Sequence, residues 1–237
     1  PAAADLGPLV TPAELSGALA SDAAPLVLDI RAPEGEASYA AGHVPGAVNA
    51  PYGRFRGPAE NPGRLPEPAA LEALLQGLGV AADRPVVVVH QGRNATDFGA
   101  AARVYWTLKS AGVSELAILN GGLAAWREAG LPLSTEAAAP APSDFALAVS
   151  DRWLATEADV RAIVEGDADA LLLDARPEAF WSGERAHPAA ARPGTLPQSR
   201  YFEHAGWFAS GPAIVNAEAA RALAEAEGFT EADALVS

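Results

Sequence analysis

One short segment occurs twice in this chain and limits the folds open to it. Leu26–Arg31 reads Leu-Val-Leu-Asp-Ile-Arg, and Leu171–Arg176 reads Leu-Leu-Leu-Asp-Ala-Arg. A threonine followed by acidic residues precedes both copies, at Thr11–Leu15 and at Thr156–Val160, and this pattern is typical of a helix N-terminus. Internal self-similarity indicates that one structural unit is used twice. The sequence therefore predicts two similar halves, each with a helix followed by a buried strand that ends in Asp-x-Arg.

The first half continues with alternating strand and helix patterns. Unbroken apolar runs at 85–90 and 116–119 predict buried strands. Helices are expected near 68–78, near 97–111 and after Gly121-Gly122. Apolar strands that alternate with helices are typical of a parallel sheet covered on both faces. The predicted fold class is therefore α/β, with two domains that each contain a parallel sheet flanked by helices.

A change in composition marks the predicted domain boundary. Residues 136–152 are rich in alanine and proline and have no apolar periodicity, a composition typical of a linker. We therefore expect a first domain over residues 1–135 and a second over residues 153–237.

The second half is predicted to be incomplete. A helix near 216–227 leads into Ala234–Ser237, which matches the beginning of the strand at 85–90. A parallel strand that stopped there would leave backbone groups and apolar surface unpaired. We therefore expect the natural polypeptide to continue past Ser237.

The net charge of the chain excludes some classes of binding partner. It has 16 lysine and arginine residues against 30 acidic residues, a formal charge of -14. Nucleic acids and anionic membranes would be repelled by such a chain, and no apolar run approaches the length of a membrane span. We expect no nucleic-acid or membrane partner, and an anionic substrate would require a local cluster of arginines.

The first residues suggest a location. Pro1–Ala4 resembles the small-residue tail of a cleaved secretory signal, which predicts a periplasmic protein. A flexible alanine-rich terminus on a cytoplasmic protein is the alternative.

Two motifs of the first half carry a family resemblance. Tyr39–Ala47 reads Tyr-x-x-Gly-His-Val-Pro-Gly-Ala, and Leu119–Trp126 reads Leu-Asn-Gly-Gly-Leu-Ala-Ala-Trp before Gly130-Leu131-Pro132. With their spacing around Asp29-Ile30-Arg31, they make the chain resemble the tandem rhodanese-type sulfurtransferases, the thiosulfate and 3-mercaptopyruvate sulfurtransferase family. The resemblance covers nearly the whole chain and implies two rhodanese-like domains, of which only the second is catalytic.

The resemblance also implies where the nucleophile lies. In this family a cysteine follows the third strand, and a loop of backbone N–H groups together with a helix N-terminus stabilises its thiolate and persulfide. His90 occupies that position in the first half, so the first domain is expected to be non-catalytic. In the second half the cysteine is expected two or three residues after Ser237, so no catalytic residue is expected within residues 1–237.

The family binds its anionic donor with arginines after the first strand of the second domain. This implies a substrate-binding role for Arg176 and an orienting role for Asp174. Arg31 occupies the equivalent place in the first half, so a purely structural role for Arg176 is the alternative. The family's second arginine is replaced by Phe180, and Arg185 on the same loop is expected to supply the missing charge unless it is a surface arginine. His187 and His204 lie on a loop expected to border the active-site cleft, but their spacing matches no metal motif.

The function implied is transfer of sulfane sulfur. A thiolate takes sulfur from thiosulfate or 3-mercaptopyruvate and passes it to cyanide or a thiol acceptor, without a cofactor or metal. A non-catalytic rhodanese-like binding or regulatory protein is the alternative, if the missing loop has no cysteine. A phosphatase on the same fold would need a longer loop.

Overall fold

The chain forms two compact units, each described separately. The computed structural model describes residues 6–188, 190–208, 211–229 and 234–237. The first unit comprises Pro1–Trp153 with Gly211–Ala213, and the second comprises Leu154–Ser210 and Ile214–Ser237. The predicted secretory remnant at Pro1–Ala4 lies outside the described residues.

The first unit is built on a five-stranded parallel sheet with the order β1-β5-β4-β2-β3. Its strands are β1 (Leu9–Val10), β2 (Leu26–Asp29), β3 (Val48–Asn49), β4 (Val86–Val89) and β5 (Leu116–Leu119). Every pair is parallel. The buried strands predicted from apolar runs are therefore confirmed, and the two-residue strands β1 and β3 extend the sheet at its edges.

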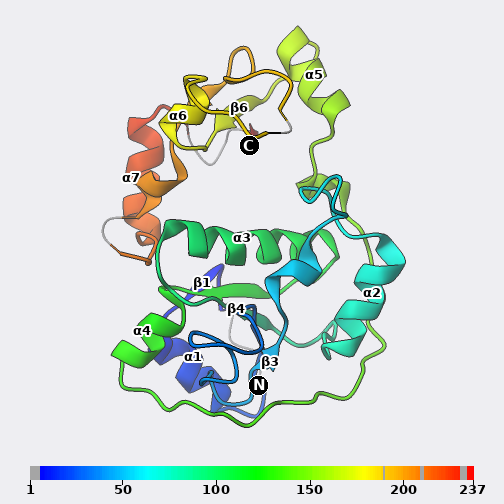
Figure 1. Ribbon diagram of the computed structural model, residues 1–237, viewed down its shortest axis with the longest axis vertical. Coiled ribbons are helices and arrows are strands. Elements are labelled where there is room, and N and C mark those ends of the chain that lie inside the picture. Colours follow the sequence, from blue (N-terminus) through cyan, green and yellow to red (C-terminus); the bar gives the residue numbers. More distant parts are fainter. Residues whose placement is uncertain (1–5, 189, 209–210, 230–233) are drawn as a thin grey trace. The chain divides into compact units, whose positions relative to one another are not determined.

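Helices cover this sheet. They are α1 (Pro12–Leu19), α2 (Pro68–Gly77), α3 (Ala95–Ser110) and α4 (Gly122–Glu128), with the short 3-10 helices η1 (Tyr52–Phe55) and η2 (Asp151–Trp153). α3 lies on one face of the sheet, and α1 and α4 lie on the other (Figure 1). The predicted cap is present at α1, where Thr11 and Glu14 form a capping box. This confirms the α/β class with helices on both faces of a parallel sheet.

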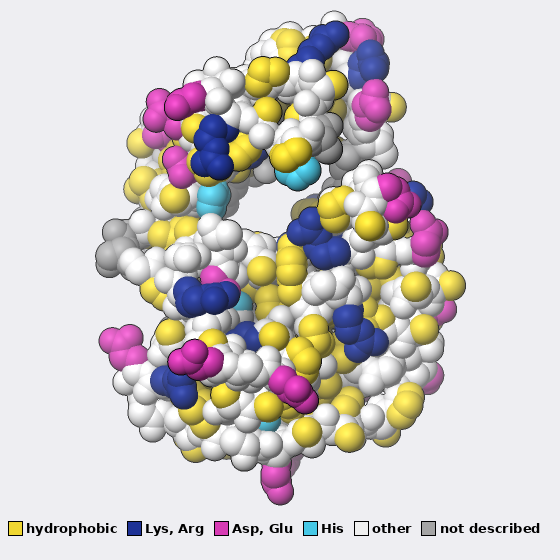
Figure 2. All heavy atoms as spheres, in the orientation of Figure 1, with side chains coloured by type: hydrophobic (Ala, Val, Ile, Leu, Met, Phe, Trp, Pro, Cys, Tyr) yellow, Lys and Arg dark blue, Asp and Glu magenta, His cyan; other side chains and the backbone are white. Residues whose placement is uncertain are grey.

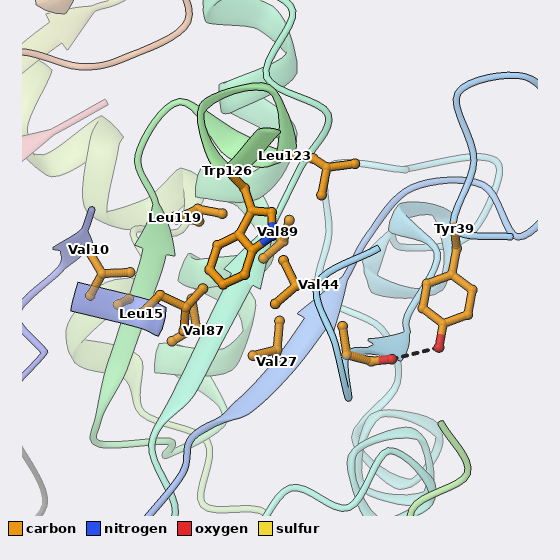
Figure 3. Close-up of a cluster of buried hydrophobic side chains, with 12 residues drawn as sticks. Val10, Leu15, Val27, Tyr39, Val44, Val87, Val89, Leu119, Leu123 and Trp126 are labelled. Atoms are coloured by element: carbon orange, nitrogen blue, oxygen red, sulfur yellow. Dashed lines mark hydrogen bonds between the residues drawn. The ribbon is translucent and has the colours of Figure 1, made fainter. Parts of the chain in front are cut away.

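The core lies between the sheet and its helices. Alternate side chains of a strand point to opposite faces, and Val27, Val87 and Leu119 point to the same side. Trp126 of α4 lies among these strand side chains and is 1% exposed (Figure 3). The cluster contains Val10, Leu15, Val27, Tyr39, Val44, Ala47, Val87, Val89, Ala117, Leu119, Leu123 and Trp126.

Residues 134–150, which we call the strap, lie along the first unit. Most of the strap falls in the segment predicted to be a linker, and it has no helix or strand of its own. It begins at an antiparallel bridge between Ser134 and His43, and Phe145 is buried. Further bonds join Ser143 Oγ to the Val80 carbonyl, Gln76 Nε2 to the Phe145 carbonyl, the Ala148 amide to the Ala111 carbonyl and the Ser150 amide to the Ser110 carbonyl. The strap is therefore a packed part of the first unit.

The second unit contains a three-stranded parallel sheet with the order β7-β6-β8. Its elements are α5 (Glu157–Glu165), β6 (Leu171–Asp174), α6 (Glu178–Trp181), β7 (Arg200–Tyr201), η3 (His204–Trp207), α7 (Ala217–Ala226) and β8 (Leu235–Val236). The capping box of α1 is repeated in α5 by Thr156 and Asp159.

Strand register is also repeated between the units. In the first unit Leu26 of β2 pairs with Val86 of β4. In the second unit Leu171 of β6 pairs with Leu235 of β8. Because Leu26 and Leu171 begin the repeated segment, Leu235 occupies the place of Val86, as the sequence comparison predicts.

Candidate anion site of the second unit

Asp174 and Arg176 form a rigid pair where β6 ends. Asp174 Oδ1 accepts hydrogen bonds from Arg176 Nε at 2.9 Å and from the Arg176 amide at 3.1 Å. Asp174 Oδ2 accepts from Arg176 Nη2 at 2.5 Å and from Thr195 Oγ1 at 2.7 Å. Such a two-point contact fixes the plane of the guanidinium group. Asp174 therefore orients the Arg176 side chain, and its role toward a substrate stays a prediction.

The first unit contains the same arrangement. Arg176 Nη2 also donates to the Gly194 carbonyl at 2.9 Å, and Arg31 Nη2 donates to Asp29 and to the Gly42 carbonyl at 2.8 Å. The arginine therefore ties a loop carbonyl to the strand end in both units.

The side chains of Arg31 and Arg176 differ in solvent exposure. The Arg31 side chain is 6% exposed, whereas the Arg176 side chain is 49% exposed. Nη1 of Arg31 donates to Gln91 Oε1 at 3.1 Å. Within the described residues, Nη1 of Arg176 has no such contact. Arg176 can therefore keep its structural bonds and still present an N–H group to a ligand.

A cavity of about 870 Å³ opens beside this pair. Its polar lining includes Asp174, Arg176, Arg192, Thr195, His204 and Ser237. All of these residues belong to the second unit. Ligand sites in open α/β sheets commonly lie at the carboxyl ends of the strands, which is where β6 ends. Its apolar lining includes Leu172 and Leu196, the equivalents of the buried core residues Val27 and Val44 of the first unit. The polar residues at the end of β6, rather than the whole cavity, are therefore the candidate binding site.

Arg185 is placed differently from Arg176. Arg185 is not among the residues that line the cavity. Its guanidinium carbon lies 5.3 Å from the centre of the Phe180 ring, and its amide donates to the Ala179 carbonyl. Arg192 lines the cavity instead. Sequence reasoning missed Arg192, because it lies in a turn before Gly194 and no motif marks it.

The pKa of Asp174 is low because of its partners. Hydrogen bonds from the Arg176 side chain, assisted by Thr195 and opposed by burial, lower the pKa of Asp174 to about 2. The unfolded-state value is about 3.9. A carboxyl group with a lowered folded pKa stabilises the fold above its unfolded pKa, and this stabilisation is lost as pH falls through the folded pKa. The Asp174 contribution is therefore present above about pH 4 and lost toward about pH 2.

This gives a testable pH dependence. The side-chain carboxyl carbon of Asp174 should titrate by NMR with a midpoint near 2, so that the group remains mostly ionised at pH 3. In Arg176→Met the midpoint should move up toward about 3.9, because the cation that stabilises the carboxylate is gone. A midpoint near 3.9 in the unsubstituted protein would show that the Asp174–Arg176 pair is not formed in solution.

In the first unit, the loop after β4 surrounds the carboxylate of Asp97. Asp97 Oδ2 accepts from the Gly92 amide at 2.6 Å, from the Arg93 amide at 3.1 Å and from His90 Nδ1 at 3.0 Å. Burial would raise the pKa of Asp97, but bonds from His90, Arg93 and Gly92 hold it well below its usual range. His90 is buried and is held by this contact with Asp97.

Charges and metal ligands elsewhere add little to the candidate site. On the face seen in Figure 2, lysine and arginine side chains are scattered among acidic ones rather than gathered in one patch. Among the described residues, no group of three or more His, Cys, Asp or Glu side chains is placed to hold a metal ion. No described helix is long and apolar enough to cross a membrane.

Known proteins resemble both the sequence and the fold. The Rhodanese-like domain model matches residues 11–129. The thiosulfate sulfurtransferase of Azotobacter vinelandii is 35% identical over 203 residues, which cover 84% of this chain and 70% of that protein. The putative thiosulfate sulfurtransferase SseB of Mycobacterium tuberculosis H37Rv is 34% identical over 187 residues, or 73% of this chain. This chain spans 62% of the length of SseB.

Solved structures agree on the fold. SseA from Escherichia coli, a 3-mercaptopyruvate sulfotransferase with the rhodanese fold, matches with a TM-score of 0.78 and 24% identity over 96% of this chain and 86% of SseA. The anaerobic ergothioneine biosynthesis enzyme of Chlorobium limicola matches with a TM-score of 0.82 and 17% identity, over 99% of this chain and 61% of that enzyme. At these identities the structures support the fold alone. The domain match and the Azotobacter relative together establish that this chain belongs to the rhodanese family.

Proposed function

We propose that this chain is the larger part of a tandem-domain sulfurtransferase whose second unit is the catalytic rhodanese-like domain. The observation that carries the proposal is the repeated register of β8 beside β6. This register supports the proposal that a cysteine two positions after Ser237 holds the place that His90 holds after β4. Relatives named thiosulfate sulfurtransferase and 3-mercaptopyruvate sulfurtransferase support the same reaction class.

The proposed reaction is a double displacement. The thiolate of a cysteine just beyond Ser237 attacks the outer sulfur of thiosulfate, forms a new S–S bond and releases sulfite. With 3-mercaptopyruvate, the C–S bond breaks instead and pyruvate leaves after taking up a proton. Cyanide or a thiolate then attacks the outer sulfur of the persulfide and regenerates the cysteine thiolate. No redox cofactor enters this balance.

The polar residues at the end of β6 supply the proposed donor site. Arg176 is proposed to bind an oxygen of the donor through Nη1, while Asp174 holds the guanidinium group in position. A guanidinium group suits an oxyanion because it offers several N–H donors in one plane. Arg192 lines the same cavity, so the proposal gives Arg192 the second cationic place that the sequence suggested for Arg185.

Sulfur loading tests this proposal. A polypeptide that extends past Ser237 through the equivalents of β4, α3, β5 and α4 is mixed with thiosulfate or 3-mercaptopyruvate and analysed by intact mass. The expected result is a gain of one sulfur, about 32 Da, from at least one donor, since the persulfide is a covalent intermediate. The gain should be absent when the proposed cysteine is replaced by serine. No gain with either donor, or no cysteine at that position, would support the non-catalytic binding module instead.

A further inference from the structure

The loop after β4 in the first unit directs backbone amides toward its interior. The Gly92 and Arg93 amides lie 2.6 and 3.1 Å from Asp97 Oδ2. The Gln91 carbonyl points the other way and accepts from the Ala124 amide of α4 at 3.1 Å. Because Gln91 and Gly92 share one peptide group, α4 holds its carbonyl while Asp97 accepts from its N–H. Successive amides that converge in this way form an anion-binding concavity.

The anion in this concavity is the Asp97 side chain. Asp97 is the third residue of α3, and its Oδ2 also lies 3.0 Å from His90 Nδ1. The Asp97 side chain is only 13% exposed. Burial alone would raise the pKa of Asp97, but these hydrogen bonds keep it well below its usual range. The loop therefore surrounds a charged carboxylate at neutral pH.

The catalytic loop of this family uses such amides to hold a sulfur anion. His90 stands at the position of the cysteine, and the Gly92 amide, two residues further on, is bonded to Asp97. One oxygen of Asp97 thus accepts the N–H groups that a persulfide would need. A second anion would meet amides that are already bonded, and the carboxylate charge would repel it.

We propose that Asp97 is a built-in occupant of this loop, whose carboxylate replaces an anionic ligand and keeps the first unit closed to sulfur anions. A cysteine at position 90 would then not be sufficient for sulfur transfer in this unit. If Asp97 served only to stabilise the N-terminus of α3, such a cysteine would react equally with and without the carboxylate. The inference concerns the first unit and does not depend on the residues that follow Ser237.

Sulfur loading of engineered variants tests this inference on the 237-residue chain. That chain contains no cysteine, so any added sulfur must be on a thiol introduced at position 90. After incubation with thiosulfate, His90→Cys alone should show no gain in intact mass, because Asp97 still occupies the loop. His90→Cys combined with Asp97→Ala should gain one sulfur, about 32 Da, as the thiolate attacks the outer sulfur of thiosulfate, forms an S–S bond and releases sulfite.

A matched control combines His90→Cys with Asp83→Ala. Asp83 is an exposed aspartate in the turn before β4, so this variant should remain unloaded. Formate provides a second measurement, because it is a small carboxylate that can take the place of the deleted group. At equal ionic strength, formate should raise the denaturant midpoint of Asp97→Ala more than that of the unsubstituted protein, since only the variant has the loop amides free to bind it.

Two results would overturn the inference. The first is a gain of sulfur by His90→Cys that is unchanged by Asp97→Ala, or no gain in the combined variant. The second is a formate effect on Asp97→Ala no larger than that on the unsubstituted protein. Sulfur loading of the longer polypeptide would still decide the proposed function, because there the reacting cysteine is expected beyond Ser237.

Discussion

Replacing Arg31 with alanine is expected to destabilise the first unit by about 3–5 kcal/mol, the usual cost of removing one partner of a buried ion pair. Asp29 is fully buried and has Arg31 as its ion-pair partner at 2.6 Å. Without the guanidinium group, the Asp29 carboxylate remains in a low-dielectric interior with its charge unpaired. The loop carbonyl of Gly42 also loses its donor.

Arg176→Ala is the matched variant, because Arg176 makes the same bonds in the second unit. Its side chain is about half exposed, so water can replace much of what is lost, and the expected cost is about 1 kcal/mol or less. Urea unfolding followed by NMR signals assigned to each unit measures both costs. In the longer polypeptide, Arg176→Ala should also abolish thiosulfate binding. Equal unfolding costs, or unchanged thiosulfate binding in Arg176→Ala, would assign Arg176 the structural role alone.

Gly92→Ala is expected to destabilise the first unit by about 2–4 kcal/mol, through strain and overlap together. Gly92 has a φ of +84°, in the left-handed region that disfavours a side chain. A Cβ atom there would lie 2.1 Å from the Gly121 carbonyl oxygen. Because the obstacle is backbone, the loop that surrounds Asp97 would have to move away from the turn at Gly121-Gly122.

Gly99→Ala is the control for this substitution. Gly99 lies inside α3, and a Cβ atom there would meet nothing within 4 Å. Alanine is the better helix former, so this variant should be more stable by about 0.5–1 kcal/mol. Denaturant midpoints of the two variants and the unsubstituted protein provide the comparison. A Gly92→Ala protein as stable as the unsubstituted one would show that the loop does not approach Gly121 this closely in solution.

The parts of the fold that the sequence predicts are those with a long, regular pattern. β4 and β5 are unbroken apolar runs, and α3 begins and ends within two residues of its expected bounds. β1 and β3 have only two residues each, too few to show a period. Their place in the sheet depends on pairing with β5 and β2, which are distant in sequence.

The residues of the candidate site also differ in whether the sequence predicts them. Asp174 and Arg176 are two residues apart at a strand end, so their pairing could be predicted from sequence. The sequence placed His204 only near a cleft, and it did not indicate Arg192. Both reach the cavity through turns whose course is set by contacts such as the two bonds from His204 to Ala175. Tertiary contacts of this kind produce no periodic pattern in the sequence from which they could be predicted.

The strap limits where this chain can change in length. Its backbone is bonded at intervals to α2 and to the end of α3, and the Ser143 hydroxyl is bonded to Val80. A linker without such bonds would accept extra residues freely. An insertion between Ser134 and Ser150 would move these hydrogen-bonding groups away from their partners. We expect this cost even though the alanine- and proline-rich composition resembles that of a flexible linker. Natural variants should therefore lengthen the chain near Trp153 and Leu154, where it passes from the first unit into the second.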